Sequence, residues 1–171
     1  MRKPTTNYIA RAAVIAAAYT ALTLIAAYAG LAYGEVQFRF SEALTILPAL
    51  TSAAIPGLTI GCFVSNLIGL GIGSTMPIDL LFGTAATLLA AVFTRMTRKV
   101  TFKGMPWLSA LFPVVFNALI VGWELTFFLP DETFLMCALL VGLGELVCCV
   151  GGGIPLFAAL KRVPSLREQW D

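Results

Sequence analysis

The amino-acid sequence predicts an all-α integral membrane protein, a six-helix bundle with two short helices in the second and third positions and both termini cytoplasmic. Composition, long uncharged runs and the distribution of positive charge support this prediction. Of the 171 residues, 59% are hydrophobic and 12% are charged, whereas soluble domains carry about 25% charged residues. The mean hydropathy is +0.91. Apolar segments and short connectors occupy the whole chain, so we expect residues 1–171 to form a single transmembrane domain.

The first half of the chain contains two uncharged runs of different length. Ala12–Gly34 is long enough to cross a hydrocarbon core of about 30 Å as one helix. Ala43–Ile78 is too long for one crossing, and Pro56-Gly57 divides it. We therefore expect two short helices, about Ala43–Ala54 and Gly57–Leu70. A re-entrant hairpin at this place is an open alternative, because it also keeps both termini on one side.

Three more spans follow in the second half of the chain. They are expected at Leu80–Thr94, Met105–Leu129 and Thr133–Leu160. The connectors Gly69–Pro77 and Phe128–Thr133 are rich in Gly, Pro and small polar residues, which is typical of turns. The sequence therefore predicts six membrane segments.

The distribution of Lys and Arg predicts the orientation of the bundle. With an even number of crossings, both termini lie on the same side as most of the basic residues. These are Arg2, Lys3, Arg11, Arg95, Arg98, Lys99, Lys103, Lys161, Arg162 and Arg167, ten of the 11 in the chain. Only Arg39 lies on the other side. Because cytoplasmic loops carry an excess of Lys and Arg, we expect both termini in the cytoplasm.

Several polar residues interrupt the apolar spans and predict a ligand pocket. Glu145 lies near the middle of one uncharged stretch, and Glu124 and Asn117 lie in another. A carboxylate inside hydrocarbon costs roughly 2.5–3.5 kcal/mol on the insertion scale, so such groups are rarely kept without a partner. We expect them to line a pocket that opens outward and is covered by the loop Gly34–Phe40. The other candidate lining residues are Asn66, Asp79, Gln37, Phe38, Arg39 and Trp123.

Each of these residues also has a structural interpretation, which the sequence leaves open. Asn66 and Asn117 can join helices through hydrogen bonds worth about 0.6 kcal/mol each. Asp79 can be a charge at a helix N-terminus, where the helix dipole favours it. Trp123, like other aromatic residues near a span end, is typical of the membrane interface. Arg39 can contact lipid phosphate or pair with a nearby acidic residue.

The sequence predicts neither a metal site nor a catalytic site. The chain has no histidine, and its four cysteines show no C-x-x-C spacing, so we interpret the cysteines as packing residues. There is no G-x-x-x-x-G-K-[ST] phosphate loop and no basic patch beyond the expected inner flank, which leaves ATP hydrolysis and nucleic-acid binding unsupported. Transport by such a chain needs an ion gradient or a partner ATPase.

Small residues on the first span predict a second kind of surface. Ala12 and Ala16, and Ala13 and Ala17, follow the small-xxx-small spacing that lets another helix approach closely. We interpret them as a docking face for a second membrane protein. Packing inside the bundle is the alternative.

Ordered motifs along the chain resemble those of the QueT family of queuosine-precursor transporters. The most distinctive stretches are Gln37–Leu44, with the sequence QFRFSEAL, and Asn117–Glu124. The other matching stretches are Ala54–Cys62, Asn66–Gly69, Asp79–Thr84, Phe116–Gly122 and Val141–Glu145. The resemblance covers essentially the whole membrane body.

The resemblance implies a substrate-binding S component of an energy-coupling factor (ECF) transporter in a bacterial plasma membrane. Such a subunit captures its ligand from outside and associates with a transmembrane coupling protein and two cytoplasmic ATPases. It binds no cofactor itself, because the partner subunits use the ATP. The implied docking surface is the small-residue face of the first helix.

The implied ligand is a 7-deazaguanine base: 7-cyano-7-deazaguanine, its aminomethyl form or queuine. Its guanine-like edge presents two parallel N–H donors, which one carboxylate can accept together. We expect Glu145 or Glu124 to bind this edge, with Asp79 next, and Asn117, Asn66 or Arg39 to donate to the carbonyl. The alternatives are an S component for another vitamin-like ligand, a stand-alone cation-coupled transporter that uses Glu145 as its proton site, and a subunit without a ligand.

Overall fold

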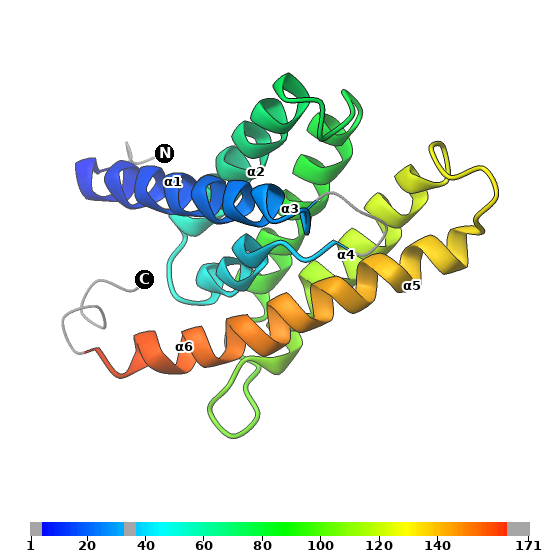
Figure 1. Ribbon diagram of the computed structural model, residues 1–171. Helices are drawn as coiled ribbons and strands as arrows, with labels where there is room; N and C mark the ends of the chain where they lie inside the picture. The colour runs from blue at the N-terminus through cyan, green and yellow to red at the C-terminus, as the bar shows by residue number, and fades with distance from the viewer. Residues whose placement is uncertain (1–4, 33–36, 164–171) are drawn as a thin grey trace.

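In the computed structural model, residues 5–32 and 37–163 are described, and these two ranges form helices and no strand. The elements, shown in Figure 1, are α1 (Thr6–Tyr28), η1 (Phe40–Ala49), α2 (Ala54–Gly71), α3 (Asp79–Met96), α4 (Trp107–Leu125), α5 (Phe134–Glu145), η2 (Leu146–Gly152) and α6 (Gly153–Lys161). η1 is a 3₁₀-helix and η2 is one stretch of π-helix. Since α5, η2 and α6 follow one another without a break, the described residues contain six helical segments, as predicted.

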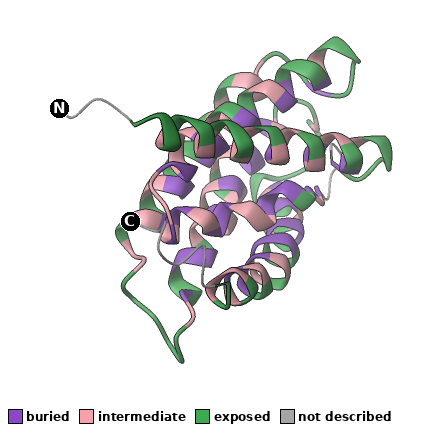
Figure 2. Cartoon of the chain, turned by 90° about the vertical axis from the view of Figure 1, so that its left-hand side faces the viewer, coloured by how far each residue is buried: buried purple, intermediate pink, exposed green. Residues whose placement is uncertain are grey.

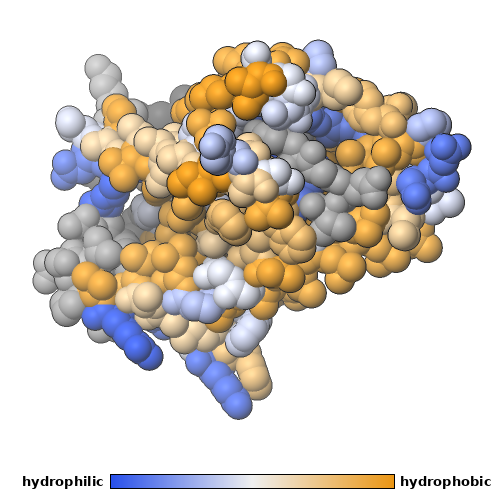
Figure 3. Space-filling view, viewed as in Figure 1, coloured by the Kyte–Doolittle hydropathy of each residue, from blue (hydrophilic) through white to orange (hydrophobic). Residues whose placement is uncertain are grey.

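Five of these segments are long and apolar enough to cross a membrane. They are α1, α2, α3, α4 and the continuous helix Phe134–Lys161. Figure 3 shows hydrophobic side chains over much of the visible surface, with the strongly hydrophilic ones toward the edges of the view. The prediction of an all-helical, multi-span membrane protein is therefore confirmed for the described part of the chain.

The third segment corrects the sequence prediction, because it is not short. α2 has 18 residues and is about 27 Å long at 1.5 Å per residue. It begins at Ala54, so Pro56 lies in its first turn, where the backbone N–H that proline lacks has no helical partner to lose. Gly57 continues the helix. A Cβ on Gly57 would lie 2.8 Å from the carbonyl oxygen of Ala12, so this glycine lets α1 and α2 pack closely.

The second segment is short, as predicted, but it is a 3₁₀-helix of 10 residues that ends at Ala49. Because a 3₁₀-helix rises about 2.0 Å per residue, η1 spans roughly 20 Å. It packs inside the bundle, with Ser41, Glu42 and Thr45 buried. This position brings polar side chains of η1 against α1 and η2.

The connectors gather at two ends of the bundle. Tyr8 at the start of α1 donates from Oη to the carbonyl of Ser52 at 3.4 Å. Lys161 at the end of α6 donates from Nζ to the carbonyl of Gly104 in the α3–α4 connector at 3.2 Å. Figure 1 shows the α2–α3 and α4–α5 connectors away from this end. The arrangement agrees with the predicted parity, and the cytoplasmic location of the termini stays a prediction from charge.

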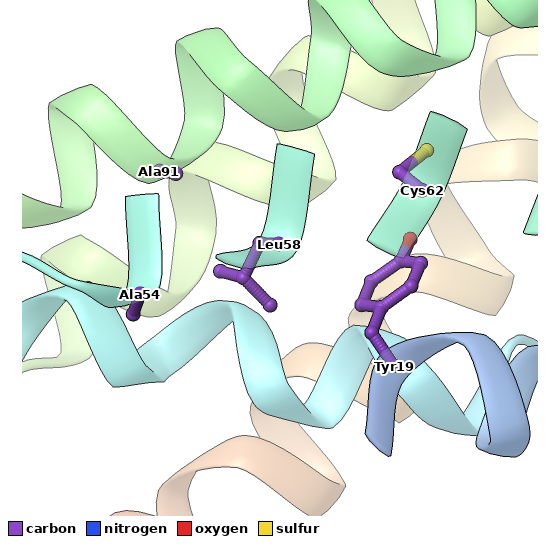
Figure 4. Packing of buried hydrophobic residues seen from close by; sticks show 5 residues of the cluster. All are labelled: Tyr19, Ala54, Leu58, Cys62 and Ala91. Carbon is purple, nitrogen blue, oxygen red and sulfur yellow. The ribbon is translucent and has the colours of Figure 1, made fainter. Parts of the chain in front are cut away.

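Small side chains hold the first three long helices together. Tyr19 of α1 packs with Ala54, Leu58 and Cys62 of α2 and with Ala91 of α3, and each of the five is fully buried. Figure 4 shows the Tyr19 ring directed from α1 toward Cys62. Figure 2 shows that the buried residues occupy parts of several helices and not one element alone. The close packing leaves the Tyr19 hydroxyl group inside the bundle, where it contacts η1.

Candidate functional site

The segment that precedes η1 lies inside the bundle. Gln37 and Arg39 are 8% and 7% exposed. The Arg39 guanidinium donates from Nε to the carbonyl of Ala32 at 3.1 Å. A Cβ on Gly144 of α5 would lie 2.2 Å from the carbonyl oxygen of Gln37, so this segment rests directly on the α5 backbone. Glycine at 144 therefore makes room for the segment that carries Arg39.

A first group of polar side chains joins α1, η1 and η2, and we name it the Glu42–Glu145 cluster. It consists of Tyr19, Glu42, Thr45, Glu145 and Cys149. Tyr19 Oη donates to Glu42 Oε1. The Cys149 thiol donates to Glu145 Oε2 at 3.2 Å, and Thr45 Oγ1 lies 3.6 Å from Cys149 Sγ. One carboxylate oxygen of each glutamate and the Cys149 sulfur lie within 4.8 Å of one another.

Sequence reasoning missed Glu42, Tyr19 and Cys149 as parts of this site. Glu42 was not among the predicted lining residues, and the four cysteines were interpreted as packing residues. A signal for Glu42 was present, since it belongs to the distinctive Gln37–Leu44 stretch and borders an uncharged run. No comparable signal existed for Tyr19 or Cys149, because only the packing of α1 and η2 around η1 brings them to Glu42.

A second polar group lies where α2, α3 and α4 meet, and we name it the Glu124–Asp79 cluster. It consists of Asn66, Asp79 and Glu124. Glu124 is 1% exposed, and neither of its carboxylate oxygens has a hydrogen-bond partner among the described residues. Asp79 is half-buried, and its carboxyl group lies close enough to Glu124 to act on it. Glu124 is therefore a buried carboxyl group whose oxygens make no hydrogen bond of ordinary geometry with the described residues.

Asp79 and Asn66 also have structural roles in this cluster. Asp79 Oδ2 accepts a hydrogen bond of 2.7 Å from the backbone N–H of Met76, as expected of a carboxylate at a helix N-terminus. Asn66 Nδ2 donates to the backbone carbonyl of Asp79 at 3.1 Å and thus joins α2 to α3. Its carbonyl oxygen Oδ1 has no partner among the described residues. The structural role of each residue therefore uses some of the polar atoms of its side chain.

Arg39 is close enough to both clusters for its charge to act on their carboxyl groups. Its positive charge acts on Glu42, Glu124 and Glu145. Asn117 of α4 is 5% exposed and lies beside Glu145, and its amide nitrogen has no acceptor among the described residues. The site thus combines three buried carboxyl groups, one buried guanidinium group and a free amide donor.

The structure turns the predicted aromatic residue Trp123 away from its buried neighbour Glu124. Trp123 is 47% exposed and contacts Phe82 and Phe127, with ring centroids 5.5 and 4.9 Å apart. It lies on the outer face of α4, as an interface residue does, whereas its neighbour Glu124 is buried. Phe38 is half-buried. The predicted covering loop is seen only from Gln37 onward, because its residues 34–36 lie outside the described ranges.

The predicted docking face on α1 divides into two parts. Ala12 and Ala16 face α2: a Cβ on Gly61 would lie 2.9 Å from the carbonyl oxygen of Ala16, and Gly57 has the same relation to Ala12. This pair therefore packs inside the bundle, which is the alternative interpretation for it. Ala13 and Ala17 are exposed. Only this second pair is available to a partner protein.

Comparisons with protein families and with curated proteins found matches that cover most of the chain. A family model described as the QueT transporter matches residues 9–162. A curated relative from Lactococcus lactis subsp. cremoris (strain MG1363), named "Queuosine precursor transporter QueT", is 28% identical over 175 residues, which cover 98% of this chain and 100% of the relative. No solved structure matches the chain.

Proposed function

Because this chain belongs to the QueT transporter family, we propose that it is the substrate-binding S component of an ECF importer for a queuosine precursor. The ligand is a 7-deazaguanine base, captured from outside the cell. The name of the Lactococcus relative supports this substrate class. Five candidate membrane spans support a multi-pass membrane protein, and the family and the relative are named as transporters and not as enzymes.

The observation that carries the proposal is that the buried Glu124 carboxylate makes no hydrogen bond of ordinary geometry with the described residues. The guanine-like edge of a 7-deazaguanine presents N1–H and an exocyclic amine as two parallel donors, and a carboxylate binds such a pair through both oxygens. Both Glu124 oxygens are buried and have no partner in the described chain. By contrast, Glu145 Oε2 already accepts a hydrogen bond from Cys149. Glu124 is therefore the better candidate for the base edge.

Asn117 and Arg39 complement this carboxylate. A 7-deazaguanine also carries a carbonyl oxygen that needs a hydrogen-bond donor. The Asn117 amide nitrogen is buried without an acceptor among the described residues, and an unsatisfied buried donor costs about 1–3 kcal/mol. The guanidinium group of Arg39 is a second donor whose charge reaches Glu124. Ligand binding would give partners to the Glu124 oxygens and the Asn117 amide, which make no hydrogen bond of ordinary geometry with the described residues.

The energy for uptake comes from partner subunits in this proposal. The chain has no phosphate loop, so a coupling protein and two cytoplasmic ATPases use the ATP, and the chain itself binds no nucleotide cofactor. The exposed pair Ala13 and Ala17 offers the coupling protein a close helix contact. A shallow groove continues this surface toward the start of α1, and it is lined by Ala10, Arg11, Val14, Ile15 and Thr51.

Direct ligand binding tests the proposal. We expect the protein, purified in detergent, to bind one molecule of a 7-deazaguanine saturably without ATP or partners. The measurement is an isothermal titration with 7-cyano-7-deazaguanine, its aminomethyl analogue, queuine and guanine, and the ranking identifies the cargo. Absence of binding by all four would reject the substrate assignment and direct the search to other vitamin-like ligands and cations.

Partner assembly tests the docking face. Replacing Ala13 or Ala17 by leucine adds a bulky side chain where the partner helix must approach closely, so we expect loss of co-purification with the coupling protein and unchanged ligand affinity. The matched control is Ala85→Leu, which makes the same change at an exposed position of α3. If assembly survives both α1 substitutions, the docking face lies elsewhere.

A further inference from the structure

The Glu42–Glu145 cluster contains a set of metal ligands that recognition of a base by Glu124 does not use. One carboxylate oxygen of Glu42, one of Glu145 and the sulfur of Cys149 lie within 4.8 Å of one another. A zinc ion with bonds of about 2.0–2.3 Å to oxygen and sulfur keeps adjacent tetrahedral ligand atoms roughly 3.5 Å apart. The 3.2 Å between Cys149 Sγ and Glu145 Oε2 is close to this spacing. Small side-chain adjustments would bring the Glu42 oxygen to the same spacing from the other two ligand atoms.

One carboxylate oxygen of the cluster is buried without a hydrogen-bond donor in the described part of the chain. Glu42 is 2% exposed, and although Oε1 accepts from Tyr19, its other oxygen Oε2 has no partner among the described residues. A buried carboxylate oxygen without a donor is costly, and a bound cation removes that cost.

The charges of the cluster match a divalent cation. Two carboxylates and one thiolate carry three negative charges, and a divalent ion together with the Arg39 guanidinium supplies three positive ones. A thiolate among the ligands favours a borderline-soft ion such as Zn²⁺ over Mg²⁺ or Ca²⁺, which prefer oxygen alone. We propose that Glu42, Glu145 and Cys149 bind Zn²⁺ in the interior of the bundle, with one coordination position open.

Neighbouring groups are placed to support the ligands. Tyr19 holds one oxygen of Glu42, and Thr45 Oγ1 lies 3.6 Å from the Cys149 sulfur. Such outer contacts orient metal ligands and typically contribute about 10–100-fold to affinity. Cys149 belongs to the π-helical stretch η2, a rare geometry that occurs often at functional sites. Zinc would tie η1 to η2 and thereby hold the segment that carries Arg39.

Metal binding can be measured without a deazaguanine, so this inference stands apart from the proposed function. We expect the metal-stripped protein in detergent to bind one Co²⁺ per chain with a thiolate-to-cobalt absorption band, and Zn²⁺ to displace it. Cys149→Ser abolishes the band. Cys148→Ser, the same change at the adjacent cysteine outside the cluster, leaves it unchanged. Glu42→Gln and Tyr19→Phe keep nearly the same shape and weaken Zn²⁺ binding by about tenfold or more.

Two results would overturn the zinc assignment. One is absence of Co²⁺ and Zn²⁺ binding by the unmodified protein when it elutes as a folded species. The other is a cobalt–thiolate band that survives Cys149→Ser. If Cys149→Ser does not fold, Zn²⁺ affinity is measured in Glu42→Gln instead. Unchanged Zn²⁺ affinity in this variant rejects the site. A titration of the deazaguanines into the metal-free protein measures base binding by itself. Failure of the zinc site can therefore be distinguished from failure of base binding.

Discussion

Replacing Glu124 by glutamine is expected to weaken binding of a 7-deazaguanine by about 100-fold or more. The carboxylate offers two acceptors to the base edge, and each charge-assisted hydrogen bond contributes about 1.5–3 kcal/mol. Glutamine keeps one acceptor and turns an N–H₂ group toward an N–H donor of the base. The side chain is 1% exposed, so water cannot take the place of the lost partner. The measurement is an isothermal titration of the purified variant.

Two further variants make this result specific. Glu132→Gln makes the same chemical change at an exposed residue of the α4–α5 connector and is expected to leave affinity unchanged. Glu145→Gln is expected to have a smaller effect on the base than Glu124→Gln, because one Glu145 oxygen is already bonded to Cys149. Full affinity in Glu124→Gln, or a larger loss in Glu145→Gln, would move base recognition to the Glu42–Glu145 cluster.

Replacing Gly144 by alanine is expected to displace the segment that carries Arg39. The new methyl group would lie 2.2 Å from the carbonyl oxygen of Gln37, a backbone atom that cannot turn aside as a side chain can. Overpacking of this kind typically costs about 1–3 kcal/mol of stability. Because the charge of Arg39 acts on three buried carboxyl groups, we expect ligand affinity to fall by about tenfold or more as well. Thermal unfolding and ligand titration measure the two effects.

A second glycine, two residues earlier in α5 and on another face of the helix, provides a control for the same chemical change. A Cβ on Gly142 would lie 3.5 Å from the Ala118 side chain, which is an ordinary van der Waals distance. Gly142→Ala should therefore keep both stability and ligand affinity. Equal behaviour of the two variants would mean that the contact between Gln37 and α5 does not position Arg39.

The sequence identified most of the buried polar groups but not how they are grouped. Glu124, Glu145 and Asn117 were predicted as polar residues inside apolar runs and Arg39 as part of the covering loop, and the structure buries each of them. Hydropathy cannot tell which oxygen of a carboxylate already has a partner, because it scores each residue alone and not its contacts. The partner of Glu145 is the Cys149 thiol, four residues further along the same continuous helix.

The start of the third helix was predicted wrongly because it also depends on contacts between elements. Pro56-Gly57 was interpreted as a break, because proline and glycine usually end helices. In the fold, proline occupies the first turn of α2, and glycine meets the backbone of α1 at Ala12. Whether a Pro-Gly pair ends a helix or begins one depends on what packs beside it.

The sequence by itself determined that this protein is a helical membrane protein with six helical segments, because apolar run length and turn residues act locally along the chain. It also determined the family through ordered motifs. Only the tertiary structure decided that η1 enters the bundle as a 3₁₀-helix, that Ala12 and Ala16 pack inward, and that Glu42 meets Tyr19. These features depend on contacts between residues far apart in the chain, and the packing of small side chains sets them.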